Sequence, residues 1–158
     1  MRFRSNHERS AVVILIIAAA ALTILPLTED LRPFRPHWLT LALFYMGVFA
    51  PLQSGIIRSW LLGVMVDVIT GSLLGIHALT FAFTTFIALQ FHLQLRVFAG
   101  AQQMVIVAIV TAINLVAEYL IYNATGRTPE TLLFWGPILT TPLFWPPLYV
   151  LADRLIRR

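Results

Sequence analysis

The chain has 158 residues, of which 59% are hydrophobic and 11% charged, and its mean hydropathy is +0.83. Soluble domains carry about a quarter charged residues, so this composition excludes a water-soluble globular domain. Cysteine is absent, which excludes disulfides, thiolate metal sites and thiol chemistry. The net charge is +4, but the arginines cluster at segment ends, where membrane topology explains them better than a nucleic-acid surface.

The first apolar run, about Ala11 to Leu27, follows a basic N-terminal head. A signal peptide cleaved near Ala19 is the competing interpretation. The apolar run continues through Leu22 and Leu25, which favours a retained membrane helix. Prolines in the connector from Thr28 to Pro36 then disfavour helix.

Five further apolar runs follow, so the sequence predicts an all-α polytopic membrane protein, a compact bundle of six transmembrane helices. A spanning helix needs about 20 residues, and six such helices nearly use up the chain as a single transmembrane domain over residues 1–158. Thr128, Pro129 and Glu130 predict the start of the last helix, and its internal prolines predict a kink or break. The predicted spans are about 11–27, 37–52, 56–71, 74–93, 104–122 and 129–151.

Six spans place both tails and two connectors, residues 53–58 and 90–103, on one side of the membrane. Eight arginines fall on that side, at positions 2, 4, 9, 58, 96, 154, 157 and 158, against three on the other side, at positions 32, 35 and 127. Because positive charge is enriched in cytoplasmic loops, both termini are predicted to be cytoplasmic.

Two carboxylates lie within predicted spans, near their outer ends. A charge at the bilayer centre costs about 2.5–3.5 kcal/mol, so Asp67 is expected to face the bundle interior and to have a partner. Glu118 lies at a comparable depth, on one helix face with Asn114 and Tyr122. Together these side chains form a polar layer near the predicted outer surface. This layer is either a functional surface, such as a proton, ligand or partner site, or a set of ion pairs that fixes helix register. The basic side chains predicted on that side, which could pair with the two carboxylates, are Arg32, Arg35, His77 and Arg127.

Other polar and small residues have simpler interpretations. Arg58, near the inner end of the third span, can extend to lipid headgroups. Gly71 and Gly75 mark a short turn, and their spacing of four also allows close helix approach. The four histidines lack metal-ligand spacing, and no hydrolase, metalloprotease or nucleotide-binding motif occurs, so the chain is predicted not to be an enzyme.

Four segments, read in order, resemble the bacterial rod shape-determining protein MreD family. The first helix ends in Leu25-Pro26-Leu27, and the connector carries Phe34-Arg35-Pro36-His37-Trp38. The segment from Gly63 to Leu79, GVMVDVITGSLLGIHAL, is similar to the family's G…D…GS.LG…AL block. The last helix is rich in proline and tryptophan, and a basic tail follows it. The resemblance covers nearly the whole chain.

The resemblance implies a multi-pass component of the bacterial inner membrane that acts in the elongation machinery for lateral peptidoglycan synthesis and cell shape. It implies direct binding to MreC, association with MreB, RodA and a penicillin-binding transpeptidase, contact with membrane lipid, and no cofactor or nucleic acid. The residues expected in an outer connector layer, for fold definition and partner docking, are Phe34, Arg35, Pro36, Trp38, Asp67, Gly71 and Gly75, with Glu118 at a similar depth.

The family also looks distantly like the substrate-binding subunits of energy-coupling-factor transporters, which are six-helix bundles. A small-molecule-binding membrane subunit of that type is therefore the alternative function, with Asp67, Asn114 and Glu118 as pocket groups. Such subunits use an AxxxA pattern in their first helix to meet the energising module. The run Ala18 to Ala21 does not supply that spacing, which disfavours transport.

Overall fold

The computed structural model describes residues 2–25, 28, 32–126 and 132–157, and the regular elements of this part of the chain are all helical. This confirms the prediction of an all-α protein, and the described residues form eight α-helices and two short 3-10 segments. In chain order they are α1 Arg2–Ile24, η1 Arg32–Phe34, α2 Trp38–Phe49, α3 Ile56–Thr70, α4 Ile76–Gln90, α5 His92–Val97, α6 Gly100–Ala124, η2 Leu132–Trp135, α7 Pro137–Leu143 and α8 Trp145–Arg157.

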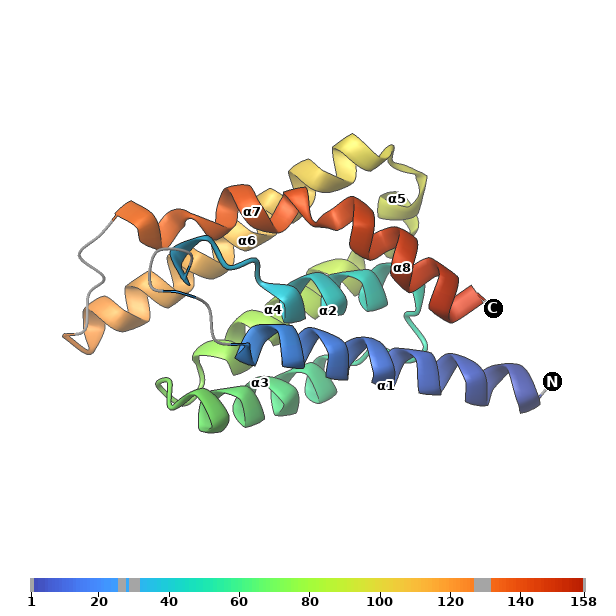
Figure 1. Ribbon diagram of the computed structural model, residues 1–158, viewed down its shortest axis with the longest axis horizontal. Helices are drawn as coiled ribbons and strands as arrows, with labels where there is room; N and C mark the ends of the chain where they lie inside the picture. The colour runs from blue at the N-terminus through green and yellow to red at the C-terminus, as the bar shows by residue number, and fades with distance from the viewer. Residues whose placement is uncertain (1, 26–27, 29–31, 127–131, 158) are drawn as a thin grey trace.

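The helices pack lengthwise into a bundle with two distinct ends (Figure 1). Both chain ends lie at one end, together with the α2–α3 turn, and we call this the terminal end. The opposite end holds η1, the α3–α4 turn and the last turns of α6, and we call it the connector end. The connector end therefore contains Phe34, in η1, and the turn with Gly71 and Gly75, three of the residues expected in the outer connector layer.

Helix α2 is the centre of the bundle. It contacts α1, α4, α5, α6 and α8, and ten of its twelve residues are buried. A helix that is surrounded in this way is apolar on every face, which explains its unbroken hydrophobic sequence. Gly47 lets α4 come close, because a Cβ at this position would lie 2.4 Å from the Ala88 Cβ.

The predicted fourth span, 74–93, is divided by the structure. Helix α4 ends at Gln90, and Phe91 separates it from the short α5. Arg96 of α5 turns back to the centre of the bundle, where its Nε and one Nη donate to the carbonyls of Val48 and Phe49 at 2.7 and 3.2 Å. A guanidinium at these carbonyls satisfies acceptors at the end of α2 that the helix itself leaves unpaired.

Helix α6 begins four residues earlier than the predicted fifth span. The side chain of Gln102 accepts a hydrogen bond from the Ala99 backbone N–H at 3.1 Å, which caps the first turn. Gln103 in the same turn accepts from the Trp145 indole Nε1–H at 3.0 Å and donates to the Leu95 carbonyl at 2.9 Å. Gln102 therefore caps the start of α6, and Gln103 connects it by hydrogen bonds to α5 and α8.

The last predicted span, 129–151, is broken, in agreement with its proline content. The described part consists of η2, α7 and α8, and α7 stops one residue after Pro142. Helix α8 restarts at Trp145, so Pro146 and Pro147 lie in its first turn, where no backbone N–H is needed. The predicted N-cap at Thr128, Pro129 and Glu130 lies outside the described residues.

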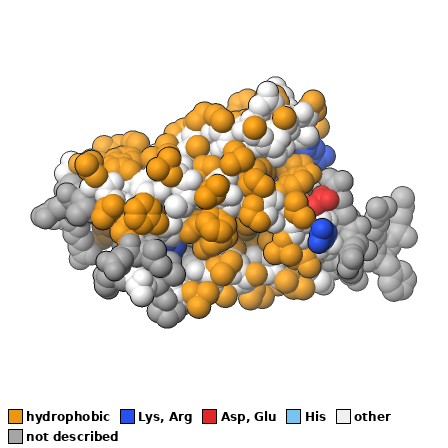
Figure 2. Space-filling view, turned by 45° about the horizontal axis from the view of Figure 1, so that its top comes forward, with side chains coloured by type: hydrophobic (Ala, Val, Ile, Leu, Met, Phe, Trp, Pro, Cys, Tyr) orange, Lys and Arg blue, Asp and Glu red, His pale blue; other side chains and the backbone are white. Residues whose placement is uncertain are grey.

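The described surface is strongly apolar. Figure 2 shows hydrophobic side chains over most of one face, with the few charged side chains towards its ends. Within the described residues, α6 is long and apolar enough to cross a membrane, and Ser10–Ile24, Trp38–Phe49, Ile76–Gln90 and Leu132–Leu143 are shorter apolar stretches. Exposed apolar surface this wide requires a non-aqueous neighbour, which is consistent with a membrane protein.

Candidate functional site at the connector end

The turn between α3 and α4 is built on two glycines. Gly71 ends α3 with φ +65°, and Ser72 donates its backbone N–H to the Asp67 carbonyl at 3.1 Å, as in a Schellman motif. Gly75 has φ +104° directly before α4. Side chains other than glycine rarely adopt such angles, so the turn requires both glycines. The described part of the chain places no atom within 4 Å of a Cβ built at either position, so it does not use the close helix approach that their spacing allows.

Asp67 caps the neighbouring helix across this turn. The residue is only 1% exposed. Its Oδ1 accepts hydrogen bonds from the Ser72 hydroxyl at 2.7 Å, from the His77 Nδ1 at 2.7 Å and from the His77 backbone N–H at 3.1 Å. Its Oδ2 accepts from the Gly75 N–H at 2.8 Å. Because Gly75 has no side chain with which to cap α4, the carboxylate of α3 satisfies N–H groups at that helix end.

Close packing of α3 on α4 supports the same hairpin. A Cβ at Gly63 would lie 2.4 Å from the Ala78 Cα and 2.5 Å from the Ala78 N, so only glycine fits here without a backbone shift. Further along the pair, the Thr85 hydroxyl donates to the Ser59 hydroxyl at 2.7 Å. The block from Gly63 to Leu79 is therefore a rigid helical hairpin whose residues define the connector end.

Glu118 lies in the last two turns of α6, at the same end of the bundle as the α3–α4 turn that carries Asp67. It is 8% exposed, and the described part of the structure gives it no hydrogen bond or ion pair. Asn114, one turn earlier, donates to the Thr84 hydroxyl at 2.8 Å, while its Oδ1 and the Thr111 Oγ1 are buried without a partner. One face of α6 therefore presents three oxygen groups whose hydrogen-bonding capacity is unused.

Arg35 of the connector does not pair with either carboxylate. Its guanidinium donates to the carbonyls of Thr23, at 2.5 Å, and Leu25 at the end of α1, and its Nε is buried without a partner among the described residues. The expected pairing with a carboxylate is confirmed for His77, whose ring contacts Asp67. The Arg32 side chain and Arg127 lie outside the described part of the chain.

The remaining connector residues pack against α7 and the residues after it. Trp38 contacts Phe144 edge to face, with ring centroids 4.9 Å apart, and the His37 backbone N–H donates to the Thr141 hydroxyl at 3.1 Å. Pro36 is buried. Phe34 differs, because its side chain is 43% exposed. The connector is thus anchored on both sides and leaves one aromatic ring free on the surface.

The site therefore combines a satisfied carboxylate with an unsatisfied one. Asp67 and its partners build the scaffold, while Glu118 and the Arg35 Nε keep an acceptor and a donor unused. The sequence singled out Asp67, Gly71, Gly75 and Glu118. The close approach at Gly63 was not predicted, although the small side chain of Ala78, which lies opposite it, is a usable signal of close helix approach.

Comparison with known proteins matches the whole chain to one family. The family model for rod shape-determining protein MreD matches residues 4–155. A rod shape-determining protein MreD of Haemophilus influenzae is 28% identical over 162 residues, which cover 100% of this chain and 98% of that protein. No solved structure matches. Because the family model covers almost the entire chain, the chain belongs to the MreD family of rod shape-determining proteins.

Proposed function

We propose that this membrane protein of the rod-shape system crosses the bacterial inner membrane six times, through α1, α2, α3, α4, α6 and the α7–α8 pair. Both termini would face the cytoplasm and the connector end would face the periplasm. The distribution of arginines, eight against three, supports this orientation. The shared position of the two chain ends in the bundle supports an even number of crossings (Figure 1).

We further propose that the chain is a non-enzymatic component of the elongation complex and binds MreC directly at the connector end. The observation that carries this proposal is the buried Glu118, which lacks a partner in the described structure. Leaving a carboxylate buried and unpaired is costly, so a donor from a partner at this position would stabilise the complex. Exposed Phe34 offers an aromatic anchor at the same end of the bundle.

Through MreC the chain would associate with MreB, RodA and a penicillin-binding transpeptidase, and would help organise lateral peptidoglycan synthesis. The rigid α3–α4 hairpin suits this role, because a scaffold that presents a docking surface benefits from one fixed geometry. Asp67, Gly71 and Gly75 would then act through the shape of the turn. Phe34 and Glu118 would touch the partner.

The test is affinity purification of the tagged chain from native membranes, with mass spectrometry of the recovered proteins. The wild-type chain should recover MreC together with MreB or RodA. Glu118→Gln should lower MreC recovery about tenfold, the loss expected from one charge-assisted hydrogen bond. Asp153→Asn, the same chemical change on α8, is the matched control and should recover MreC normally.

Two results would contradict this function. Normal MreC recovery by Glu118→Gln, at an equal protein level, would remove Glu118 from the interface. Recovery of paired ATPases and a coupling membrane protein in place of MreC would indicate the transporter alternative.

A further inference from the structure

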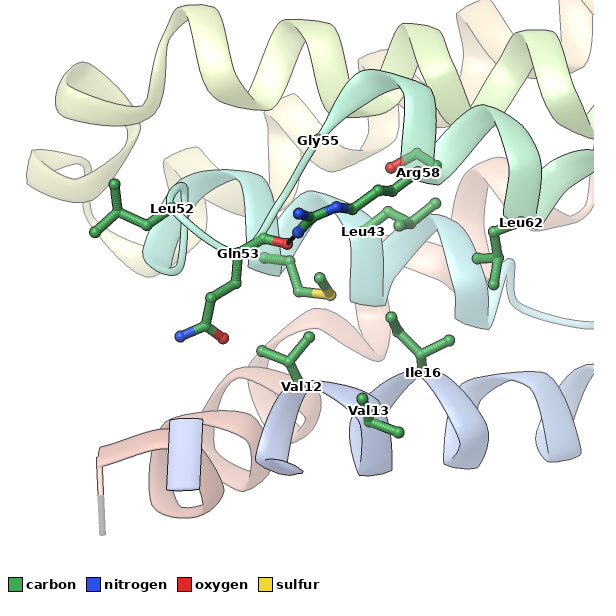
Figure 3. Close-up of a pocket in the computed structure, with 11 residues that line it drawn as sticks. Val12, Val13, Ile16, Leu43, Leu52, Gln53, Gly55, Arg58 and Leu62 are labelled. Atoms are coloured by element: carbon green, nitrogen blue, oxygen red, sulfur yellow. Dashed lines mark hydrogen bonds between the residues drawn. The ribbon is translucent and has the colours of Figure 1, made fainter. Parts of the chain in front are cut away.

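A groove runs between α1 and α3 at the terminal end, far from the connector end. The two helices lie on either side of α2, which forms the floor (Figure 3). The groove contains a cavity of about 650 Å³, which is within the range of small-molecule sites. Its apolar lining comes from three helices, through Val12, Val13, Ile16, Leu43, Met46 and Leu62.

We call the line along which α1 and α3 face each other the α1–α3 seam. Side chains leave empty space along this seam beyond the first cavity as well. A second cavity of about 40 Å³ lies along it, lined by Ile24 of α1, Leu39 of α2 and Val66 of α3, among others. From Val12 to Ile24 the seam spans about 18 Å at 1.5 Å per residue. One leaflet of the hydrocarbon core is about 15 Å thick, so the seam has the length of a lipid acyl chain in one leaflet.

The size of the second cavity decides which occupant fits the seam. A helix with side chains is about 10–12 Å wide along its whole length. The two cavities along the seam have unequal volumes, about 650 Å³ and about 40 Å³. The small second cavity has no room for a helix, whereas a flexible hydrocarbon chain can fill the large cavity and bend along the surface of the seam.

A cation stands at the wide end of the groove. Arg58 is exposed and donates one hydrogen bond, to the Gln53 carbonyl at 3.2 Å (Figure 3). The guanidinium carries five N–H donors in a planar fork that suits phosphate oxygens. Among the side chains that the structure describes, which on α1 begin at Ser10, none that is acidic lines the cavity or lies in the first turn of α3. The charge at the mouth therefore complements an anionic headgroup.

We propose that this groove binds an anionic phospholipid, with one acyl chain along the α1–α3 seam and the phosphate on the Arg58 guanidinium. The large cavity and Arg58 lie at the opposite end of the bundle from the proposed MreC surface, and the proposal does not depend on that surface. It is a lipid-binding site formed by a gap between two helices that flank α2 without packing on each other there.

The test uses the full chain, purified in a non-ionic detergent, stripped of lipid and exposed to phosphatidylglycerol or phosphatidylcholine, with native mass spectrometry of the bound lipid. Wild-type protein should retain phosphatidylglycerol in preference to phosphatidylcholine. Arg58→Gln should lower phosphatidylglycerol retention about tenfold, as expected for loss of one charge-assisted contact. Arg154→Gln removes an exposed charge outside the groove and should retain the lipid normally.

A second variant tests the groove itself. Val13→Trp fills the cavity and should abolish retention of the lipid, whereas Ile14→Trp should not. Ile14 has the same 53% exposure as Val13 on the same helix but does not line the cavity. Equal phosphatidylglycerol retention by wild type, Arg58→Gln and Val13→Trp would overturn the proposal. Loss of a co-purifying membrane protein from Val13→Trp, with lipid retention unchanged, would overturn it in favour of a partner helix.

Discussion

Replacement of Asp67 by alanine tests whether the carboxylate holds the α3–α4 hairpin together. The variant loses all four hydrogen bonds, and the backbone N–H groups of Gly75 and His77 lose their acceptor. Hydrogen bonds to a charged group contribute about 1.5–3 kcal/mol each. The Ser72 hydroxyl and the His77 ring can turn to other partners, so we count the two backbone bonds at the lower value, about 3 kcal/mol in total.

For a chain of this size, 1 kcal/mol shifts Tm by about 2–4 °C, so Asp67→Ala should lower Tm by about 6–12 °C. The measurement is thermal unfolding of the purified protein in one detergent, with helix content from circular dichroism. Asp67→Asn keeps one acceptor oxygen and should fall between wild type and Asp67→Ala. Ser72→Ala removes a single donor and should change Tm least. A wild-type Tm in Asp67→Ala would refute the capping role.

Three further substitutions test individual contacts by the same Tm measurement. Gly63→Ala should sharply lower Tm and the yield of folded protein, because the added Cβ meets the backbone of α4. Gly100→Ala is the control, since a Cβ there has open space and the variant should match wild type. Equal values for the two variants would contradict the close approach of α3 and α4. Arg96→Ala should destabilise the fold by about 1–2 kcal/mol, because the last carbonyls of α2 lose their donor; an unchanged Tm would mean that solvent or lipid replaces it. Trp145→Phe should cost about 1–3 kcal/mol by leaving the buried Gln103 Oε1 without its indole donor; a neutral result would show that Gln103 repacks.

The features that depend on local sequence could be predicted. Apolar run lengths indicate an all-α protein, and the prolines of the last segment locate its break. The glycine pair at positions 71 and 75 locates the turn, and the presence of Asp67 inside an apolar helix identifies it as a residue with a partner. In each case the signal lies within a few residues of the feature, so no knowledge of the packing is needed.

The features that depend on packing could not be predicted. Arg35 has the charge to pair with Asp67, but the connector carries it to the carbonyls at the end of α1. From the sequence alone, Arg96 is indistinguishable from a charged residue in a surface connector. Only the packing of α5 on α2 brings its guanidinium to the carbonyls at the end of α2. The break at Phe91 has no glycine or proline to mark it. The α1–α3 groove is a gap between helices that are not neighbours in sequence.

Site-specific photo-crosslinking in living cells is the most direct test of the proposed MreC surface. A photoreactive amino acid would replace Phe34, which is 43% exposed just before α2, or Leu52, which is 97% exposed just after it at the opposite end of the bundle. Docking of MreC at the connector end predicts a strong MreC adduct from position 34 and little or none from position 52. An MreC adduct from position 52 alone would contradict it and would move the interface to the terminal end.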